Sequence, residues 1–157
     1  DFPERIRLLN ERLTLPALLY ARGNVAILNR PGAAIVGRRQ TGEAALALAA
    51  SLAAELAAQG VNVISGYAAG IDAAAHLGAL RAGGTTTVVL AEGIHHFRTK
   101  PAFKDFLTVD NILVVSQFDP DARWAPYLAM ERNKLVGALA SVLVVITSGP
   151  ERDSDGE

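Results

Sequence analysis

Five short apolar runs, most of them separated by helix-forming segments, constrain the fold of this chain more than any other feature. They are rich in valine and isoleucine and nearly continuous rather than alternating, which is typical of strands buried on both faces of a sheet. Their β-branched side chains also favour a pleated backbone. The runs are residues 33–37, 61–65, 86–91, 112–116 and 142–147. This pattern predicts a mainly parallel sheet covered by helices.

Helix-forming segments lie between most of these runs. Residues 42–60 consist largely of alanine, leucine and glutamate, which are strong helix formers. Residues 72–84 open on Asp72, which we predict to be an N-cap, and residues 127–140 place apolar side chains near helical spacing. A shorter helix is predicted at 100–107. Strands alternating with helices predict a three-layer, Rossmann-like, doubly wound α/β fold with helices on both faces of the sheet.

The organisation of the chain predicts a single domain over residues 1–157. This length suits one domain, and no internal repeat or long linker divides it. We expect residues 1–32, where prolines and glycine interrupt apolar pieces, to be a leading segment packed on the sheet edge. Residues 148–157 are polar and acidic, and we expect them to form a frayed tail. Because the sequence does not begin with methionine, we also expect a fragment or a processed form.

Composition narrows the function classes. The formal net charge of −1 gives no sign of a nucleic-acid or membrane partner either way, so any anion binding must come from local placement of basic groups. The absence of cysteine excludes disulfides, zinc–thiolate sites and cysteine nucleophiles, and it fits a reducing compartment. No apolar run approaches the roughly 18 residues that a membrane helix needs. We predict a soluble, cytoplasmic protein with no metal and no cofactor.

The loops that follow the strands are the informative ones, because ligands of open α/β sheets bind at the carboxyl ends of the strands. "GRRQTG" (37–42) follows the first run, "SGYAAGID" (65–72) the second, and "ERNK" (131–134) lies beyond the fourth. Neither a P-loop nor a dinucleotide-binding G-x-G-x-x-G is present in these loops. An ATPase of the P-loop class and an ordinary dehydrogenase are therefore disfavoured.

The glycine-rich loop after the second run has two interpretations. Gly66 and Gly70 can present backbone N–H groups to an oxyanion, and the positive end of the following helix favours phosphate. Alternatively, the loop is only a tight strand-to-helix turn with Asp72 as its cap, and the Asp72 carboxylate would then compete with an anion. Arg38 and Arg39 have the side chains that match phosphate geometry, although surface arginines are often only solvated.

Histidines and aromatic residues supply further candidates. His76 lies four residues after Asp72 on the same helix face, and His95 and His96 are neighbours in a loop. Such histidines can ligate a metal or titrate near neutrality, but most are structural or exposed, and no third ligand accompanies His76. Trp124 and Tyr127 can stack on nucleobases or serve as packing anchors.

Three stretches carry a resemblance to a known family. They are "LPALLYARGNVAILNRPGAAIVGRRQT", "GVNVISGYAAGIDAAAHLGALRAGGTTTVVLAEGI" and "ERNKLVGALASVLVVITSG". In this order they resemble the DNA-processing protein A family, whose patterns there are "IVGSR", "SGLARGIDxxAHxGAL" and "RNRIIAGLS". The match between Ser65 and Gly84 is long and specific.

The resemblance implies a protein that binds single-stranded DNA and hands it to a RecA-type recombinase during natural transformation. It also implies a Rossmann-like core, a homodimer and no catalytic activity. On this basis, the phosphate-binding or nucleic-acid-binding residues are expected to be Gly37, Arg38, Arg39, Ser65, Gly66, Gly70, Asp72, Arg132, Asn133 and Lys134.

The chain departs from the family pattern at several positions. Ala69 replaces a family arginine that contributes to DNA binding, and Arg38 stands where a serine is usual. Residues 93–103 lack the usual aspartate and Tyr-Pro. These changes keep two alternatives open. One is binding or hydrolysis of a small nucleotide, in the N-glycosidic cleavage class, with Glu92, His95, His96 and Arg98 nearby. The other is a partner subunit that keeps dimer contacts and binds nothing itself.

Overall fold

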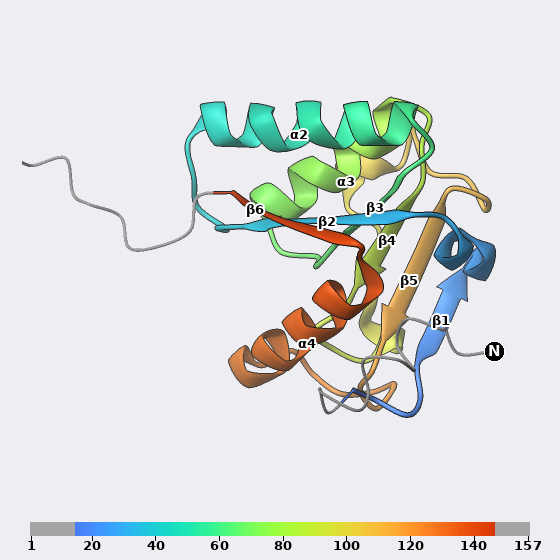
Figure 1. The fold of residues 1–157 in the computed structure, drawn as a ribbon. Helices are drawn as coiled ribbons and strands as arrows, with labels where there is room; N and C mark the ends of the chain where they lie inside the picture. The colour runs from blue at the N-terminus through green and yellow to red at the C-terminus, as the bar shows by residue number, and fades with distance from the viewer. Residues whose placement is uncertain (1–14, 147–157) are drawn as a thin grey trace, which may run out of the picture.

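The apolar runs form neighbouring strands of one sheet in the computed structural model, which describes residues 15–146 (Figure 1). The sheet has six strands in the order β1-β5-β4-β3-β2-β6. Strands β2 to β6 are all parallel to one another, whereas β1, at one edge, pairs antiparallel with β5. The strands are β1 (Tyr20–Gly23), β2 (Gly32–Gly37), β3 (Asn62–Ser65), β4 (Thr86–Val89), β5 (Ile112–Ser116) and β6 (Val142–Ile146).

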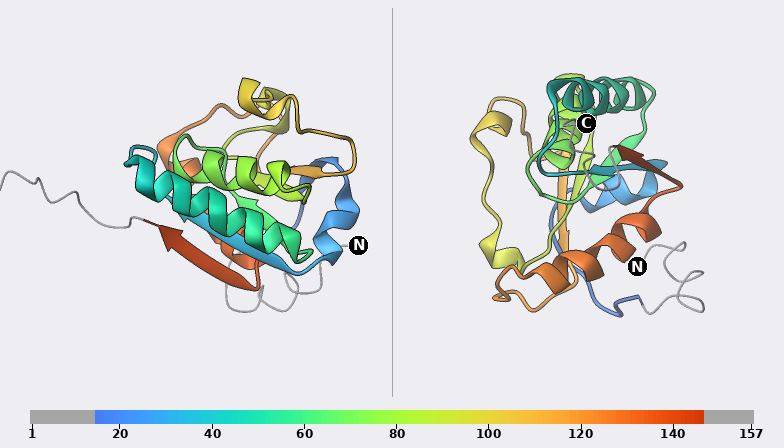
Figure 2. Two further views of the ribbon diagram at one scale, coloured as in Figure 1. Left: turned by 90° about the horizontal axis from the view of Figure 1, so that it is seen from above. Right: turned by 90° about the vertical axis from the view of Figure 1, so that its left-hand side faces the viewer.

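Helices cover both faces of the sheet. The views in Figures 1 and 2 show α2 (Glu43–Ala58) and α3 (Ile71–Arg81) side by side on one face and α4 (Pro126–Leu139) on the other. Three short 3-10 helices lie in the connections: η1 (Val25–Asn29), η2 (Ile94–His96) and η3 (Pro101–Phe103). None of the helices within residues 15–146 combines the length and the apolar character that crossing a membrane requires.

Alternate residues along each strand supply the two halves of the core. Ile35 and Val63 face α2 and α3, where they pack with small helix residues such as Ala49 and Ala75. Their chain neighbours Ala34 and Ile64, with further strand residues, pack on the opposite face against Leu135, Val136, Ala138 and Leu139 of α4. Because both faces of the strands are buried, the strand sequences are continuous apolar runs rather than alternating ones.

The predicted fold class is therefore confirmed, and the remaining differences are local. The helix predicted at 100–107 is wrong. Only Pro101–Phe103 are helical there, as the 3-10 turn η3, and such turns seldom exceed about three or four residues. Within the leading segment, residues 20–23 form β1 beside β5. Predictions made for residues 1–14 and 147–157 lie outside the described residues.

The strand order places a topological switch point between β2 and β6. From β2 the chain proceeds through β3 and β4 to β5 in one direction, and α4 then returns it to β6 on the other side of β2. In open α/β sheets, the crevice outside the carboxyl ends of the strands at such a point is the usual ligand site.

Candidate functional site

Two pockets open at the carboxyl ends of the strands. The first, which we call the arginine pocket, has a volume of about 340 Å³ and lies at the switch point. Residues from the ends of β2 and β6, from the two loops after β2 and β3, and from α3 and α4 line it: Val36, Gly37, Arg38, Arg39, Ala68, Asp72, Ala129, Arg132, Asn133 and Val145.

The second pocket, which we call the tryptophan pocket, lies beside the first and has a volume of about 300 Å³. The two pockets share Arg39, Ala68 and Arg132. The other residues that line the tryptophan pocket are Tyr67, Ala69, Leu90, Ala91, Glu92 and Trp124. The shared arginines therefore separate two adjacent pockets.

Arg132 is the buried cation at the centre of the site. Helix α4 carries it towards the strand ends, where only 6 % of the residue is exposed. Its Nη1 donates to the carbonyl oxygen of Val89 at 2.9 Å, and its Nε donates to Oδ1 of Asn133 at 3.2 Å. Burial lowers the pKa of the Arg132 guanidinium, and the nearby carboxylate of Asp72 opposes that effect. These contacts fix the direction of the guanidinium.

Asp72 lies in the first turn of α3 and is not its N-cap, which corrects the prediction from sequence. The N-cap is Gly70, and the Asp72 side chain, with 5 % of the residue exposed, turns inward towards Arg132. Burial raises the pKa of this carboxyl group, while Arg132 and backbone hydrogen bonds from Ala68 and Gly37 lower it. Asp72 therefore neutralises part of the charge of Arg132 from within the protein.

The side chain of His76 holds the glycine-rich loop through a hydrogen bond to its backbone. It is fully buried, and because a carbonyl only accepts, its Nε2 donates to the carbonyl oxygen of Gly66 at 2.5 Å. Its Nδ1 lies 2.6 Å from Oγ1 of Thr86. Burial lowers the pKa of His76 to about 4, so the ring is neutral near pH 7. This histidine positions the backbone of the loop and ties it to the start of β4 through Thr86.

Two backbone donors of the loop are used within the protein. The N–H of Ile71, at the start of α3, donates to the carbonyl oxygen of Arg38 at 3.2 Å, and the N–H of Ala68 serves Asp72. Gly66 is buried against Arg132 and Asp72, and the Ser65 hydroxyl donates inward to the carbonyl oxygen of Ile35 at 2.6 Å. These contacts support the tight-turn interpretation, and phosphate binding by Gly66 and Gly70 stays a prediction.

The remaining predicted cations fall into two groups. Arg38, half-buried, and Arg39, exposed, line the arginine pocket together with Asn133. Lys134 lies elsewhere on α4, exposed, with its Nζ 3.0 Å from Oε1 of Glu131, and it lines neither pocket. A helix turns by about 100° per residue, so Arg132 and Lys134, two residues apart on α4, point to nearly opposite sides.

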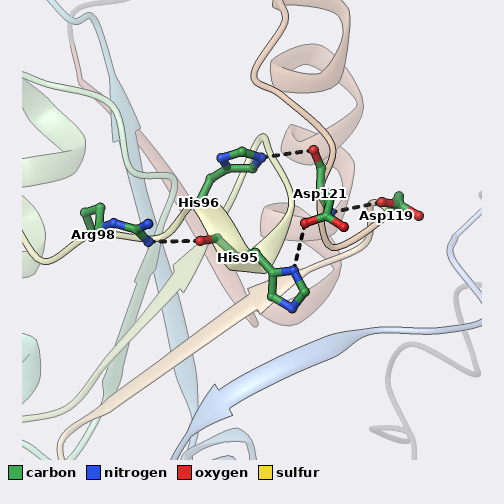
Figure 3. A network of polar contacts seen from close by, with 5 residues as sticks. All are labelled: His95, His96, Arg98, Asp119 and Asp121. Atoms are coloured by element: carbon green, nitrogen blue, oxygen red, sulfur yellow. Dashed lines mark hydrogen bonds and ion pairs between the residues drawn. The ribbon is translucent and has the colours of Figure 1, made fainter.

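Two loops are joined beside the tryptophan pocket (Figure 3). His95 Nδ1 lies 2.9 Å from Oδ1 of Asp121, and His96 Nε2 lies 2.9 Å from the carbonyl oxygen of Asp121. Arg98 donates to the carbonyl oxygens of His95 and Phe97, so its guanidinium serves its own loop. Within residues 15–146, no three side chains of His, Asp or Glu gather to hold a metal ion.

Sequence reasoning missed several residues of the site. Tyr67 lines the tryptophan pocket, and its hydroxyl donates to the carbonyl oxygen of Arg98 at 2.9 Å. Lys100 adds a cation 4.6 Å from the centre of the Tyr67 ring. Only the position of Tyr67 near the end of a strand pointed to this role, while Lys100 contacts Tyr67 from the connection between β4 and β5 and lines neither pocket.

The sequence model described as DNA recombination-mediator protein A matches residues 1–153. The chain belongs to this family. The resemblance inferred from the motifs is thereby confirmed, and the strand ends of the family fold carry the two pockets. Ala69, where an arginine was expected, lines the tryptophan pocket and is exposed.

Individual relatives agree with this assignment. The chain is 32 % identical over 143 residues to the DNA processing protein DprA of Streptococcus pneumoniae, covering 87 % of this chain and 49 % of the relative. The X-ray structure of that protein superposes with a TM-score of 0.79 at 27 % identity, covering 92 % of this chain and 50 % of the other. The chain thus spans about half the length of this relative.

Two further structures are similar. DNA processing protein A from Helicobacter pylori, which has a single-stranded DNA binding mode, gives a TM-score of 0.78 at 26 % identity, covering 92 % of this chain and 66 % of that one. The molybdenum cofactor carrier protein of Chlamydomonas reinhardtii gives 0.56 at 26 % identity, covering 77 % and 65 %. Similar folds are therefore found in a DNA-binding protein and in a carrier of a small cofactor.

Proposed function

We propose that this chain binds single-stranded DNA, without sequence preference, through phosphates held in the arginine pocket. The observation that carries the proposal is the convergence of Arg38, Arg39 and Arg132 at the strand ends of a family fold whose H. pylori member has a single-stranded DNA binding mode. Contacts to phosphate position a strand but do not read its bases.

The charge balance of the arginine pocket supports an anionic ligand. Three guanidinium groups line it, and Asp72 is the one carboxylate among its lining residues. Because Asp72 is buried and faces Arg132, it holds that arginine in place and leaves Arg38 and Arg39 to attract phosphate. Asn133 accepts from Arg132 through Oδ1, so its amide nitrogen is the part that can donate to a phosphate oxygen.

Fluorescence anisotropy of a labelled single-stranded oligonucleotide at low salt tests this proposal. Arg38→Ala and Arg39→Ala are each expected to weaken binding by about tenfold or more, because a hydrogen bond to a charged group contributes about 1.5–3 kcal/mol. Arg30→Ala is the matched control, since Arg30 is exposed and lies just before β2, at the amino end of that strand. If the wild-type chain does not bind, or if Arg30→Ala weakens binding as much as Arg39→Ala, the proposal is wrong.

The finer role follows from the family resemblance and extends the same proposal. The bound strand would be handed to a RecA-type recombinase during DNA uptake, in the cytoplasm and by a homodimer. Light scattering of the purified chain with and without oligonucleotide tests the dimer. Delivery is tested by the rate at which a RecA-type protein forms filaments on strands coated with this chain.

A small nucleotide in the same site is the second candidate. The pocket volumes of about 340 and 300 Å³ favour it, because they match the lower end of the range for small-molecule sites. Glu92 in the tryptophan pocket would then be the candidate group for N-glycosidic cleavage. A thermal-shift screen separates the candidates, because a rise in Tm with one nucleotide and none with oligonucleotides favours the small ligand.

A further inference from the structure

Trp124 is the only tryptophan of the chain, and it is not part of the core. It lies in the connection between β5 and α4, lines the tryptophan pocket, and is 45 % exposed. Neither of the two core clusters on the faces of the sheet includes it. A packing anchor would be buried, so the exposure of this indole calls for another explanation.

Arg39 connects Trp124 to the arginine pocket. Its guanidinium carbon lies 4.8 Å from the centre of the indole ring, a cation–π arrangement. Arg39 lines both pockets, so the group proposed to hold a phosphate lies directly against the aromatic ring. In a nucleotide the phosphate and the base are likewise neighbours, one sugar apart.

The loop that carries Trp124 is held by polar contacts to the loop after β4. Gly93 N–H donates to the carbonyl oxygen of Ala122 at 2.8 Å, and His95 N–H donates to that of Pro120 at 3.1 Å. Asp121 adds the two histidine contacts described above (Figure 3). These contacts hold the loop as far as Ala122, two residues before Trp124, which reduces the entropy that the loop loses on binding.

We infer that Trp124 is a base-stacking residue, against which a nucleobase lies while the adjoining phosphate binds Arg39. The inference rests on the proposed binding of single-stranded DNA and adds a second type of contact to it. Every base has an aromatic face, so stacking on an indole tolerates any sequence. The ligand class is thus a single strand with accessible bases, and paired bases inside a duplex do not fit this site.

Tryptophan fluorescence tests the inference directly, because Trp124 is the sole emitter of its kind in the chain. Titration with a short oligo-dT strand should quench the emission as the strand binds. An abasic strand of equal length, with the same phosphates and no bases, should bind more weakly and leave the emission nearly unchanged. Anisotropy of the same labelled strands measures binding independently of the indole.

Variants separate stacking from a merely structural role. Trp124→Ala should weaken binding of oligo-dT by about tenfold to a hundredfold and leave binding of the abasic strand unchanged. Trp124→Phe should restore part of the lost affinity. Tyr127→Ala is the matched control, because Tyr127 is 69 % exposed and three residues away but lines neither pocket.

The outcomes are distinguishable from those of the proposed function. If oligo-dT and the abasic strand bind equally, with no quenching and no effect of Trp124→Ala, the stacking role is wrong while DNA binding stands. If neither strand binds, both proposals are wrong. Base-dependent binding with quenching supports both.

Discussion

Arg132 and Asp72 face each other across Gly66. Nη1 of the arginine and Oδ2 of the aspartate each lie 2.5 Å from the position that a Cβ on Gly66 would occupy. Both side chains are buried, and each shifts the pKa of the other towards its charged form. The loop after β3 can therefore only close over this charge pair if it carries glycine at position 66.

Removing the buried cation is expected to destabilise the fold as well as the site. Arg132→Ala leaves the Asp72 carboxylate buried without its compensating charge, which should lower the free energy of unfolding by about 3 kcal/mol. Lys134→Ala, on the same helix, removes an exposed ion pair with Glu131 and should cost less than about 1 kcal/mol. Urea denaturation measures both, and equal losses would contradict a special role for the buried pair.

Two glycine substitutions should change stability in opposite directions. Gly70 has a φ of +81°, and a Cβ there would overlap the backbone of Arg38 and Arg39, so Gly70→Ala should cost about 2 kcal/mol or more. Gly137 lies inside α4 with open space around it, so Gly137→Ala should add about 0.5–1 kcal/mol. Thermal unfolding of the two variants checks this, and a tolerated Gly70→Ala would refute the close approach of the two loops.

His76 should make stability depend on pH. The unfolded chain binds a proton at this residue below about pH 6.5, whereas burial holds the pKa in the folded protein at about 4. Between these values protons favour the unfolded chain, so the histidine should contribute a loss of about 3 kcal/mol as pH falls from 6.5 to 4.

The variant His76→Gln isolates this contribution, because glutamine stays neutral throughout. Asp72 acts in the opposite sense, since its raised pKa favours the folded chain as pH falls, but it is present in both proteins. The difference in unfolding free energy between wild type and variant should therefore shrink as pH falls. A constant difference across this range would show that His76 is solvated in the folded state.

Much of the fold is predictable from the strands because burial on both faces imposes an unbroken apolar run. The run at 112–116 coincides with β5, and β6 takes up all the described residues of the run at 142–147. The prediction of a helix at 100–107 was wrong, because only the short 3-10 turn that begins at Pro101 forms there. The pairing of β1 with β5 joins residues about ninety positions apart, which local pattern does not specify.

The candidate site was only partly predictable. Position after a strand identified Arg38 and Arg39, and the family motif identified Arg132 and Asn133. The same reasoning placed Lys134 beside Arg132, although the helical turn points it away, and made Asp72 a cap although it is buried against Arg132. These details depend on which way a side chain leaves its helix in the folded protein, and on a partner distant in sequence.

The salt dependence of binding is the sharpest test of a phosphate-binding site at the strand ends. If Arg38 and Arg39 each neutralise a phosphate, the logarithm of the association constant for oligo-dT should fall against the logarithm of salt concentration with a slope of about −1.4. Arg39→Ala should reduce the slope by about 0.7, and Arg30→Ala should leave it unchanged. An absence of binding at low salt, or an affinity that neither salt nor Arg39→Ala alters, would contradict a phosphate-binding site at the strand ends.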